Sequence, residues 1–156
     1  MVYNTPVDKN TVLVSGAILF KEVAGVQKYF VIKEPNDDKW QFVKLIVRKG
    51  ESSVRAVIRI MGERGAMTVR VLEEAGRFRS VSTNNGKALT QNNIYYIMLL
   101  KSSSKEAKAF GDVLWLDYIK ASKKLSSKKE AAMLKNTRDI LKEWEKKRKR
   151  KKLQAS

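Results

Sequence analysis

One amphipathic segment constrains the fold of this chain more than any other feature. The stretch 40–67 reads WQFVKLIVRKGESSVRAVIRIMGERGAM, and its second half has apolar residues at i, i+3, i+4 and i+7. On a helix this spacing forms one apolar stripe, made by Val54, Val57, Ile58 and Met61. Ser52 or Ser53 is a suitable N-cap, and Gly65 is a suitable end. The segment therefore predicts a strand and a basic loop that lead into one helix packed on a core.

The polar edge of the same helix carries charged residues four positions apart. Glu51, Arg55, Arg59 and Glu63 stack along one face just beyond the loop. Such an edge is commonly a solvated, salt-bridged surface. Its spacing also agrees with a longer pattern that spans the whole stretch.

The stretch resembles the Nudix box, G-x5-E-x7-R-E-U-x-E-E-x-G-U, where U is a bulky aliphatic residue. Glu51 and Arg59 match the first glutamate and the arginine, Glu63 matches the first paired glutamate, and Met61 and Met67 match aliphatic positions. The upstream WQFVK is similar to the W-x-x-P-K lead-in of Nudix hydrolases, and GES to their G-E-S/T. The resemblance implies the fold of that family and a site for phosphate-containing ligands.

Four positions depart from the box. Leu45 and Ala66 stand where it has glycines, and Ile60 and Arg64 stand where it has glutamates. In active family members these glutamates hold magnesium and help to activate the attacking water. Magnesium takes oxygen ligands, mostly carboxylates, so an isoleucine and a cation are poor substitutes. We therefore predict a degenerate box. Its remaining catalytic candidates are Glu51, Arg59 and Glu63, with Glu63 as the candidate metal ligand if Mg²⁺ is used.

Basic residues gather around the loop and the helix, where the resemblance implies that substrate phosphates lie. The predicted phosphate-binding residues are Lys44, Arg48, Arg55 and Arg64, with Lys49 nearby. In this hypothesis Arg64 replaces the metal, so that guanidinium groups bind a phosphate or diphosphate directly. The alternative is that these residues only pair with Glu51 and Glu63. The acidic pair Glu73-Glu74 is either a substitute set of metal ligands or a solvated strand edge.

Composition limits the chemistry that the chain can perform. Its 156 residues, 43% of them hydrophobic, predict one domain with a real core. Cysteine and histidine are absent, which excludes disulfides, thiolate nucleophiles, the usual zinc sites and imidazole catalysis. No apolar run approaches a membrane span, and residues 1–10 lack the apolar core of a signal peptide. The expected location is cytoplasmic.

Positive charge is the second strong signal, and it is concentrated at the C-terminus. The chain has 33 Lys and Arg against 16 Asp and Glu, a net charge of +17. Residues 120–156 hold 15 of these basic and 4 of these acidic residues, a net +11, which leaves +6 for residues 1–119. A balance of this kind implies a polyanionic partner.

The excess culminates in seven consecutive basic residues: Lys146, Lys147, Arg148, Lys149, Arg150, Lys151 and Lys152. They follow the end of an apolar helical stripe made by Met133, Leu134, Thr137, Ile140, Leu141 and Trp144. We expect them to project from the body and to bind nucleic acid, with RNA favoured over DNA. An anionic membrane surface or a solubilising role without a partner remain as alternatives.

The rest of the chain alternates strand patterns with turn signals. Strands are predicted at 11–20, 28–33, 40–47, 68–73, 76–81, 92–101 and 113–116, turns at 24–25, 35–38 and 84–86, a turn or short helix at 117–125, and a long helix at 127–151. The run 92–101 is apolar enough for a central strand buried on both faces. Together with the resemblance, this order predicts an α/β (α+β) protein of the Nudix fold, a mixed β-sheet sandwiched between helices, with a long basic C-terminal helix.

The predicted organisation is an N-terminal extension (1–10), a Nudix-like domain (11–145) and a basic tail (146–156). Three functional classes remain open. The first is a catalytically impaired protein that binds a nucleotide or phosphate in its cleft and RNA through its tail. The second is an active divergent hydrolase that cleaves nucleoside diphosphate-linked substrates with Mg²⁺. The third is a nucleotide-sensing regulatory protein. The oligomeric state stays open in all three.

Overall fold

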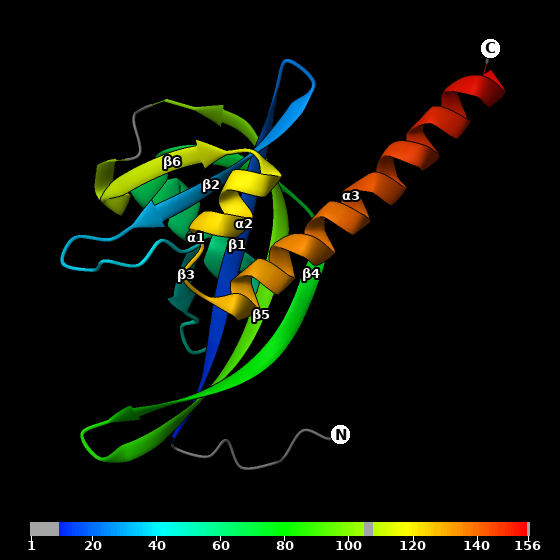
Figure 1. Ribbon diagram of the computed structural model, residues 1–156. Coiled ribbons are helices and arrows are strands. Elements are labelled where there is room, and N and C mark those ends of the chain that lie inside the picture. The colour runs from blue at the N-terminus through cyan, green and yellow to red at the C-terminus, as the bar shows by residue number, and fades with distance from the viewer. Residues whose placement is uncertain (1–9, 105–107, 156) are drawn as a thin grey trace, which may run out of the picture.

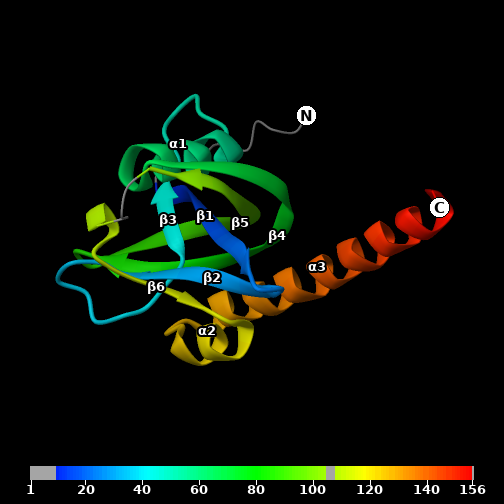
Figure 2. The same cartoon turned by 90° about the horizontal axis from the view of Figure 1, so that it is seen from above.

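A mixed β-sheet sandwiched between helices forms the body of the protein (Figures 1 and 2). The computed structural model describes residues 10–104 and 108–155. The strands are β1 (Thr11–Val23), β2 (Val26–Lys33), β3 (Val43–Ile46), β4 (Met67–Asn84), β5 (Lys87–Ser103) and β6 (Asp112–Leu116). The helices are α1 (Ser53–Gly65), α2 (Tyr118–Lys124) and α3 (Lys128–Ala155), with a 3-10 turn η1 (Lys108–Phe110). This architecture confirms the predicted fold class.

Strand β1 lies at the centre of the sheet, whose order is β4-β5-β1-β2-β6. It runs parallel to β5 and antiparallel to β2 and β3, which makes the sheet mixed. Along its other edge β1 pairs first with β3, from Val14 to Ala17, and then with β2, from Phe20 to Val23. The length of β1 therefore allows one edge to hold two successive partners.

Two tight hairpins follow from residues that accept a left-handed backbone. Ala24 and Gly25 have φ values of 52° and 79° between β1 and β2, and Asn85 and Gly86 have 53° and 77° between β4 and β5. Two successive positive φ values twist a two-residue turn in the sense that matches the strands. Both turns were predicted from the sequence, and both are confirmed.

Two apolar layers hold the sandwich together. Side chains alternate along β1, so Ala17 and Leu19 belong to the layer under α1, whereas Ile18 and Phe20 belong to the opposite layer. Helix α1 contributes Val57 and Met61 to the first layer, and α3 contributes Met133, Leu134 and Leu141 to the second. Figure 2 shows α1 on one side of the sheet and α2 and α3 on the other.

Several predicted boundaries need correction. Strand β4 runs unbroken from Met67 to Asn84 through three register shifts, and it joins the predicted segment 68–73 to 76–81, which was expected to continue it. The predicted strand 40–47 is regular only at 43–46. Ile58 is 43% exposed, so its assignment to the apolar stripe of α1 was wrong. The buried face of the helix includes Ala56 instead, which is fully buried. Helix α3 is confirmed and continues four residues further than predicted, to Ala155.

The proposed N-terminal extension lies, apart from Asn10, outside the described residues. Across the described ranges, every helix is too short or too polar to cross a membrane.

Candidate functional site

The start of helix α1 is tied to the sheet by hydroxyl groups. The Ser52 side chain caps the helix by accepting a hydrogen bond from the Arg55 backbone N–H at 3.2 Å. On the inner side, Ser15 Oγ donates to the Ser53 carbonyl at 2.7 Å, and the Ser53 and Tyr96 hydroxyls are in contact. These bonds fix the loop 47–52 relative to β1 and β5.

An arginine-centred ion cluster occupies the polar edge of α1. The Arg59 guanidinium donates twice to the Glu51 carboxylate, at 2.8 and 3.1 Å, and once to Glu63 at 3.3 Å. Hydrogen bonding with Arg59 lowers the pKa of the Glu51 carboxyl, and the same bond raises the pKa of Arg59. The sequence placed these three residues together, and the structure does so. Both oxygens of the Glu51 carboxylate therefore accept hydrogen bonds from Arg59, whereas the Glu63 side chain is 56% exposed.

Ile60 and Arg64, which the resemblance aligns with glutamates of the box, have contacts of their own. Ile60 packs, partly buried, on the apolar layer beneath α1. Arg64 donates to Glu34 Oε1 at 3.0 Å and to the Ala109 carbonyl at 2.7 Å, and its guanidinium lies 4.7 Å from the Phe110 ring. The guanidinium of Arg64 thus links α1 to the loop after β2 and to η1.

The predicted phosphate-binding residues separate into two groups. Arg48 and Arg55, together with Lys49, line a depression beside Gly50, Glu51 and the Ser52 cap, and we call these six residues the loop depression. Lys44 is not part of this lining, because its ammonium pairs with Glu130 at 3.0 Å. Arg64 is likewise absent from the lining and pairs with Glu34.

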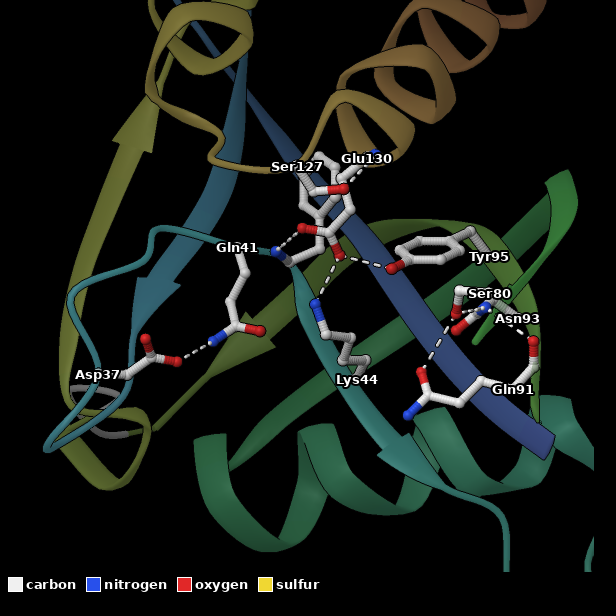
Figure 3. Close-up of polar contacts among 10 residues, drawn as sticks. Asp37, Gln41, Lys44, Ser80, Gln91, Asn93, Tyr95, Ser127 and Glu130 are labelled. Carbon is white, nitrogen blue, oxygen red and sulfur yellow. Dashed lines mark hydrogen bonds and ion pairs between the residues drawn. The ribbon is translucent and has the colours of Figure 1, made fainter. Parts of the chain in front are cut away.

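A buried carboxylate at the start of α3 was missed from the sequence. Glu130 is 1% exposed and accepts hydrogen bonds from the Phe42 backbone N–H, the Lys44 ammonium and the Tyr95 hydroxyl (Figure 3). Burial, aided by this carboxylate, raises the pKa of Tyr95, which therefore acts as a neutral donor. A signal was present: Glu130 precedes Met133 and Leu134 by three and four residues, so it shares their apolar stripe.

The ring of Tyr95 reaches Glu130 across a glycine. A Cβ atom on Gly16 would lie 2.6 Å from the Tyr95 ring, closer than any side chain tolerates. Gly16 therefore leaves the space that the Tyr95 ring needs to reach Glu130. Tyr95 is 1% exposed and belongs to the core.

The acidic residues Glu73 and Glu74 of β4 form hydrogen bonds with side chains outside helix α1. Glu73 accepts from the indole N–H of Trp144 at 2.9 Å, and Glu74 forms a bidentate pair with Arg77. In the part of the chain that the structure describes, no three Asp or Glu residues gather closely enough to hold a metal ion. The suggestion that Glu73 and Glu74 supply substitute metal ligands is therefore not supported.

Solved structures with a similar fold include proteins that are named as NUDIX domains or hydrolases. A C. elegans Ap4A hydrolase binary complex matches with a TM-score of 0.66 and 16% identity, over 83% of this chain and 97% of that one. The NUDIX domain of Shewanella oneidensis NrtR, complexed with ADP ribose, matches with a TM-score of 0.61 and 16% identity, over 90% and 94%. A NUDIX hydrolase from Nitrosomonas europaea matches with a TM-score of 0.66 and 14% identity, over 83% and 89%.

The chain has the Nudix fold. No protein-family model and no curated protein matches the sequence itself. The likeness is therefore one of architecture.

Proteins of the Nudix fold that hydrolyse their substrates typically use Mg²⁺, and the residues present do not fit that ion. Magnesium needs an octahedral shell of oxygens, usually with more than one from carboxylates or substrate phosphates. Here the Glu51 carboxylate is hydrogen-bonded to Arg59, the Ile60 side chain has no oxygen, and the Arg64 side chain carries a positive charge. Glu63 is the one carboxylate of α1 that remains accessible.

The basic tail lies on the C-terminal part of α3, which extends well beyond the sheet (Figure 1). All seven residues from Lys146 to Lys152 are exposed. Within the described ranges their ion pairs are weak surface contacts, from Lys146 to Glu143 at 3.5 Å and from Arg148 to Glu145 at 3.6 Å. The tail thus presents a continuous cationic surface.

Proposed function

We propose that this is a cytoplasmic Nudix-fold protein with impaired hydrolysis, which binds a nucleotide or phosphate group at the loop depression and RNA through its basic tail. One observation carries the proposal. The two positions of α1 where the Nudix box has additional glutamates hold Ile60, packed on the core, and Arg64, paired with Glu34. These two positions therefore supply none of the carboxylates that a metal needs, and the cations available to a phosphate lie at the start of the helix, in the loop depression.

The loop depression supports the binding of an anion. Arg48, Lys49 and Arg55 surround Gly50, directly before the first turn of α1. Guanidinium groups bind phosphate through paired hydrogen bonds, and the start of a helix adds backbone N–H groups and a favourable dipole. In residues 10–104 and 108–155 these three cations have no ion pair of their own, so an incoming phosphate would displace no carboxylate.

The basic tail supports the nucleic-acid part. Seven exposed cations on a helix neutralise phosphates of a polyanion, which releases counterions and makes binding strongly dependent on salt. Such contacts position a protein on a strand without reading its sequence.

An active divergent hydrolase is the second candidate. The ion cluster of Glu51, Arg59 and Glu63 favours it, as do the structural neighbours that are named as hydrolases. The two candidates differ in their need for a metal, which an assay can measure directly. The active enzyme needs a divalent metal, whereas the impaired protein binds its ligand without one.

The first experiment measures the binding of ADP and its hydrolysis in parallel, with and without Mg²⁺. We expect metal-independent binding that weakens in an Arg48→Gln, Arg55→Gln variant, and no release of phosphate or AMP. Arg79→Gln, an exposed change on β4, is the matched control and should bind as the wild type does. Mg²⁺-dependent turnover by the wild type would replace this proposal with the second candidate.

A restored box provides the converse test. Ile60→Glu with Arg64→Glu returns both carboxylates, and Glu34→Gln prevents the new glutamate at position 64 from facing Glu34. If the box is a decayed active site, the triple variant gains Mg²⁺-dependent hydrolysis. A folded triple variant that binds ADP as the wild type does would show that Arg64 takes no part in phosphate binding.

The RNA part is tested by filter binding over a range of salt. The wild type should bind single-stranded RNA with an affinity that falls steeply as salt rises. Replacing Lys149, Arg150, Lys151 and Lys152 by Gln should reduce both the affinity and the salt slope. An unchanged affinity in that variant would remove the tail from the account.

A further inference from the structure

A groove lies at the base of the basic tail, where α3 passes over the edge of the sheet. Its apolar floor consists of Phe20 from β1, Leu72 from β4, Leu99 from β5 and Leu141 from α3, and Trp144 from α3 forms an aromatic wall. Its volume is about 330 Å³. That size is at the lower end of small-ligand sites and suits one flat ring system.

The aromatic wall of the groove is held in place. Trp144 is 38% exposed, although large aromatic side chains are usually covered. Its indole N–H donates to Glu73 on β4 at 2.9 Å, which ties the exposed ring to the sheet. A ring ordered in advance loses little conformational entropy when a partner stacks on it.

Cations join the groove to the basic tail. Arg148 is four residues beyond Trp144, so it lies on the same face of α3, and it belongs to the run of seven basic residues. Its pair with Glu145, at 3.6 Å, is a surface contact that a phosphate can replace. Arg70 from β4 also lines the groove, and it forms no ion pair with any residue of 10–104 or 108–155.

The polar rim also carries hydrogen-bond acceptors. Glu22 and Gln27 from the β1–β2 hairpin, and Glu145 from α3, line the groove. Carboxylates repel a bare phosphate but accept hydrogen bonds from the amino groups of bases. An apolar floor, an aromatic wall and a rim of mixed charge therefore suit a nucleobase better than a phosphate.

We propose that this groove takes one unpaired base of a single-stranded RNA, with the flanking phosphates on Arg70, Arg148 and the basic tail. The inference rests on the nucleic-acid binding proposed above, and it adds a preference for particular kinds of RNA. A paired base is stacked inside its helix and cannot enter, so the protein prefers single strands to duplexes. The acceptors on the rim favour bases with amino groups, hence oligoadenylate over oligouridylate.

The test compares three polyanions on the full chain: a short oligoadenylate, an RNA duplex, and inorganic polyphosphate of similar charge. The wild type should bind oligoadenylate most tightly. Trp144→Leu should weaken oligoadenylate binding by roughly ten- to a hundredfold and leave polyphosphate binding unchanged. Trp144→Phe keeps an aromatic ring and should stay close to the wild type. Circular dichroism and thermal melting verify that the variants are folded.

Salt titration separates the base from the phosphates. Arg148→Gln should reduce the salt slope for single strands by about 0.7, whereas Trp144→Leu should leave the slope unchanged. Lys151→Gln, at the far end of the tail, is the matched control and should weaken oligoadenylate and polyphosphate equally.

Each failure has a distinct meaning. If Trp144→Leu binds oligoadenylate as the wild type does, or if the wild type binds polyphosphate as tightly as oligoadenylate, the groove is not a base site, and the tail alone binds RNA. If the wild type binds none of the three polyanions, the nucleic-acid function fails and this inference fails with it. An acidic peptide whose binding needs Trp144, while that of RNA does not, would assign the groove to a protein partner.

Discussion

Removing the carboxylate of Glu130 should destabilise the protein more than any surface change on α3. In Glu130→Ala the Phe42 N–H and the Tyr95 hydroxyl both lose their acceptor in the core, and each buried donor left without a partner costs about 1–3 kcal/mol. Lys44, whose side chain is 34% exposed, can turn toward water and adds little. The expected loss of unfolding free energy is roughly 3 kcal/mol, which lowers the melting temperature by about 6–12 °C in a chain of this size.

Urea unfolding followed by circular dichroism measures this loss. Glu143→Ala, on the same helix, is the matched control, because Glu143 is 63% exposed and its ion pair within the described residues is a surface contact with Lys146; its change should stay within about 0.5 kcal/mol. Glu130→Gln keeps an acceptor and should fall between the two. If Glu130→Ala costs less than about 1 kcal/mol, the buried network does not anchor α3, and the reasoning is refuted.

Three further changes test other parts of the account. Gly16→Ala places a methyl group 2.6 Å from the Tyr95 ring and should cost about 1–3 kcal/mol in urea unfolding, whereas Gly62→Ala, with open space around it, should be neutral or stabilising. Ala66→Gly relieves a left-handed residue at φ 50° and should raise stability by roughly 0.5–1 kcal/mol; a lower melting temperature would contradict this. Glu51→Gln should destabilise at neutral pH. Because the folded-state pKa of that carboxyl is lowered, its contribution is present above the unfolded pKa and lost as the pH falls through the folded one. The gap to wild type in melting temperature should therefore begin to narrow below about pH 4 and continue to close as the pH falls through the folded-state pKa; a gap that does not narrow in acid would exclude the ion pair as its cause.

Local signals made most of the fold predictable. The turn residues Ala24-Gly25 and Asn85-Gly86, the cap at Ser52 and the end of α1 at Gly65 each act over a few residues, and the structure contains all of them. The Nudix-like spacing of Glu51, Arg59 and Glu63 placed the ion cluster correctly.

Features that depend on contacts between residues far apart in the chain could not be predicted from the sequence. The pairing with β5 carries β4 through its register shifts, so no local pattern shows that residues 74–75 belong to the same strand as the predicted segments 68–73 and 76–81. The sequence predicts Lys44 and Arg64 on the phosphate-binding surface because they are near the loop and helix in the chain, yet their partners are Glu130 and Glu34, which are remote in sequence. Glu130 itself looks like an ordinary residue of a first helical turn until β3 and β5 surround it.

Titration calorimetry of Mg²⁺ and then Mn²⁺ into the full chain, with and without ADP, tests the central claim most directly. The donor set of α1 predicts no metal binding in the millimolar range, together with ADP binding that needs no metal and weakens as salt rises. Millimolar or tighter metal binding, accompanied by slow release of AMP or phosphate, would contradict the account and make this protein an active Nudix hydrolase.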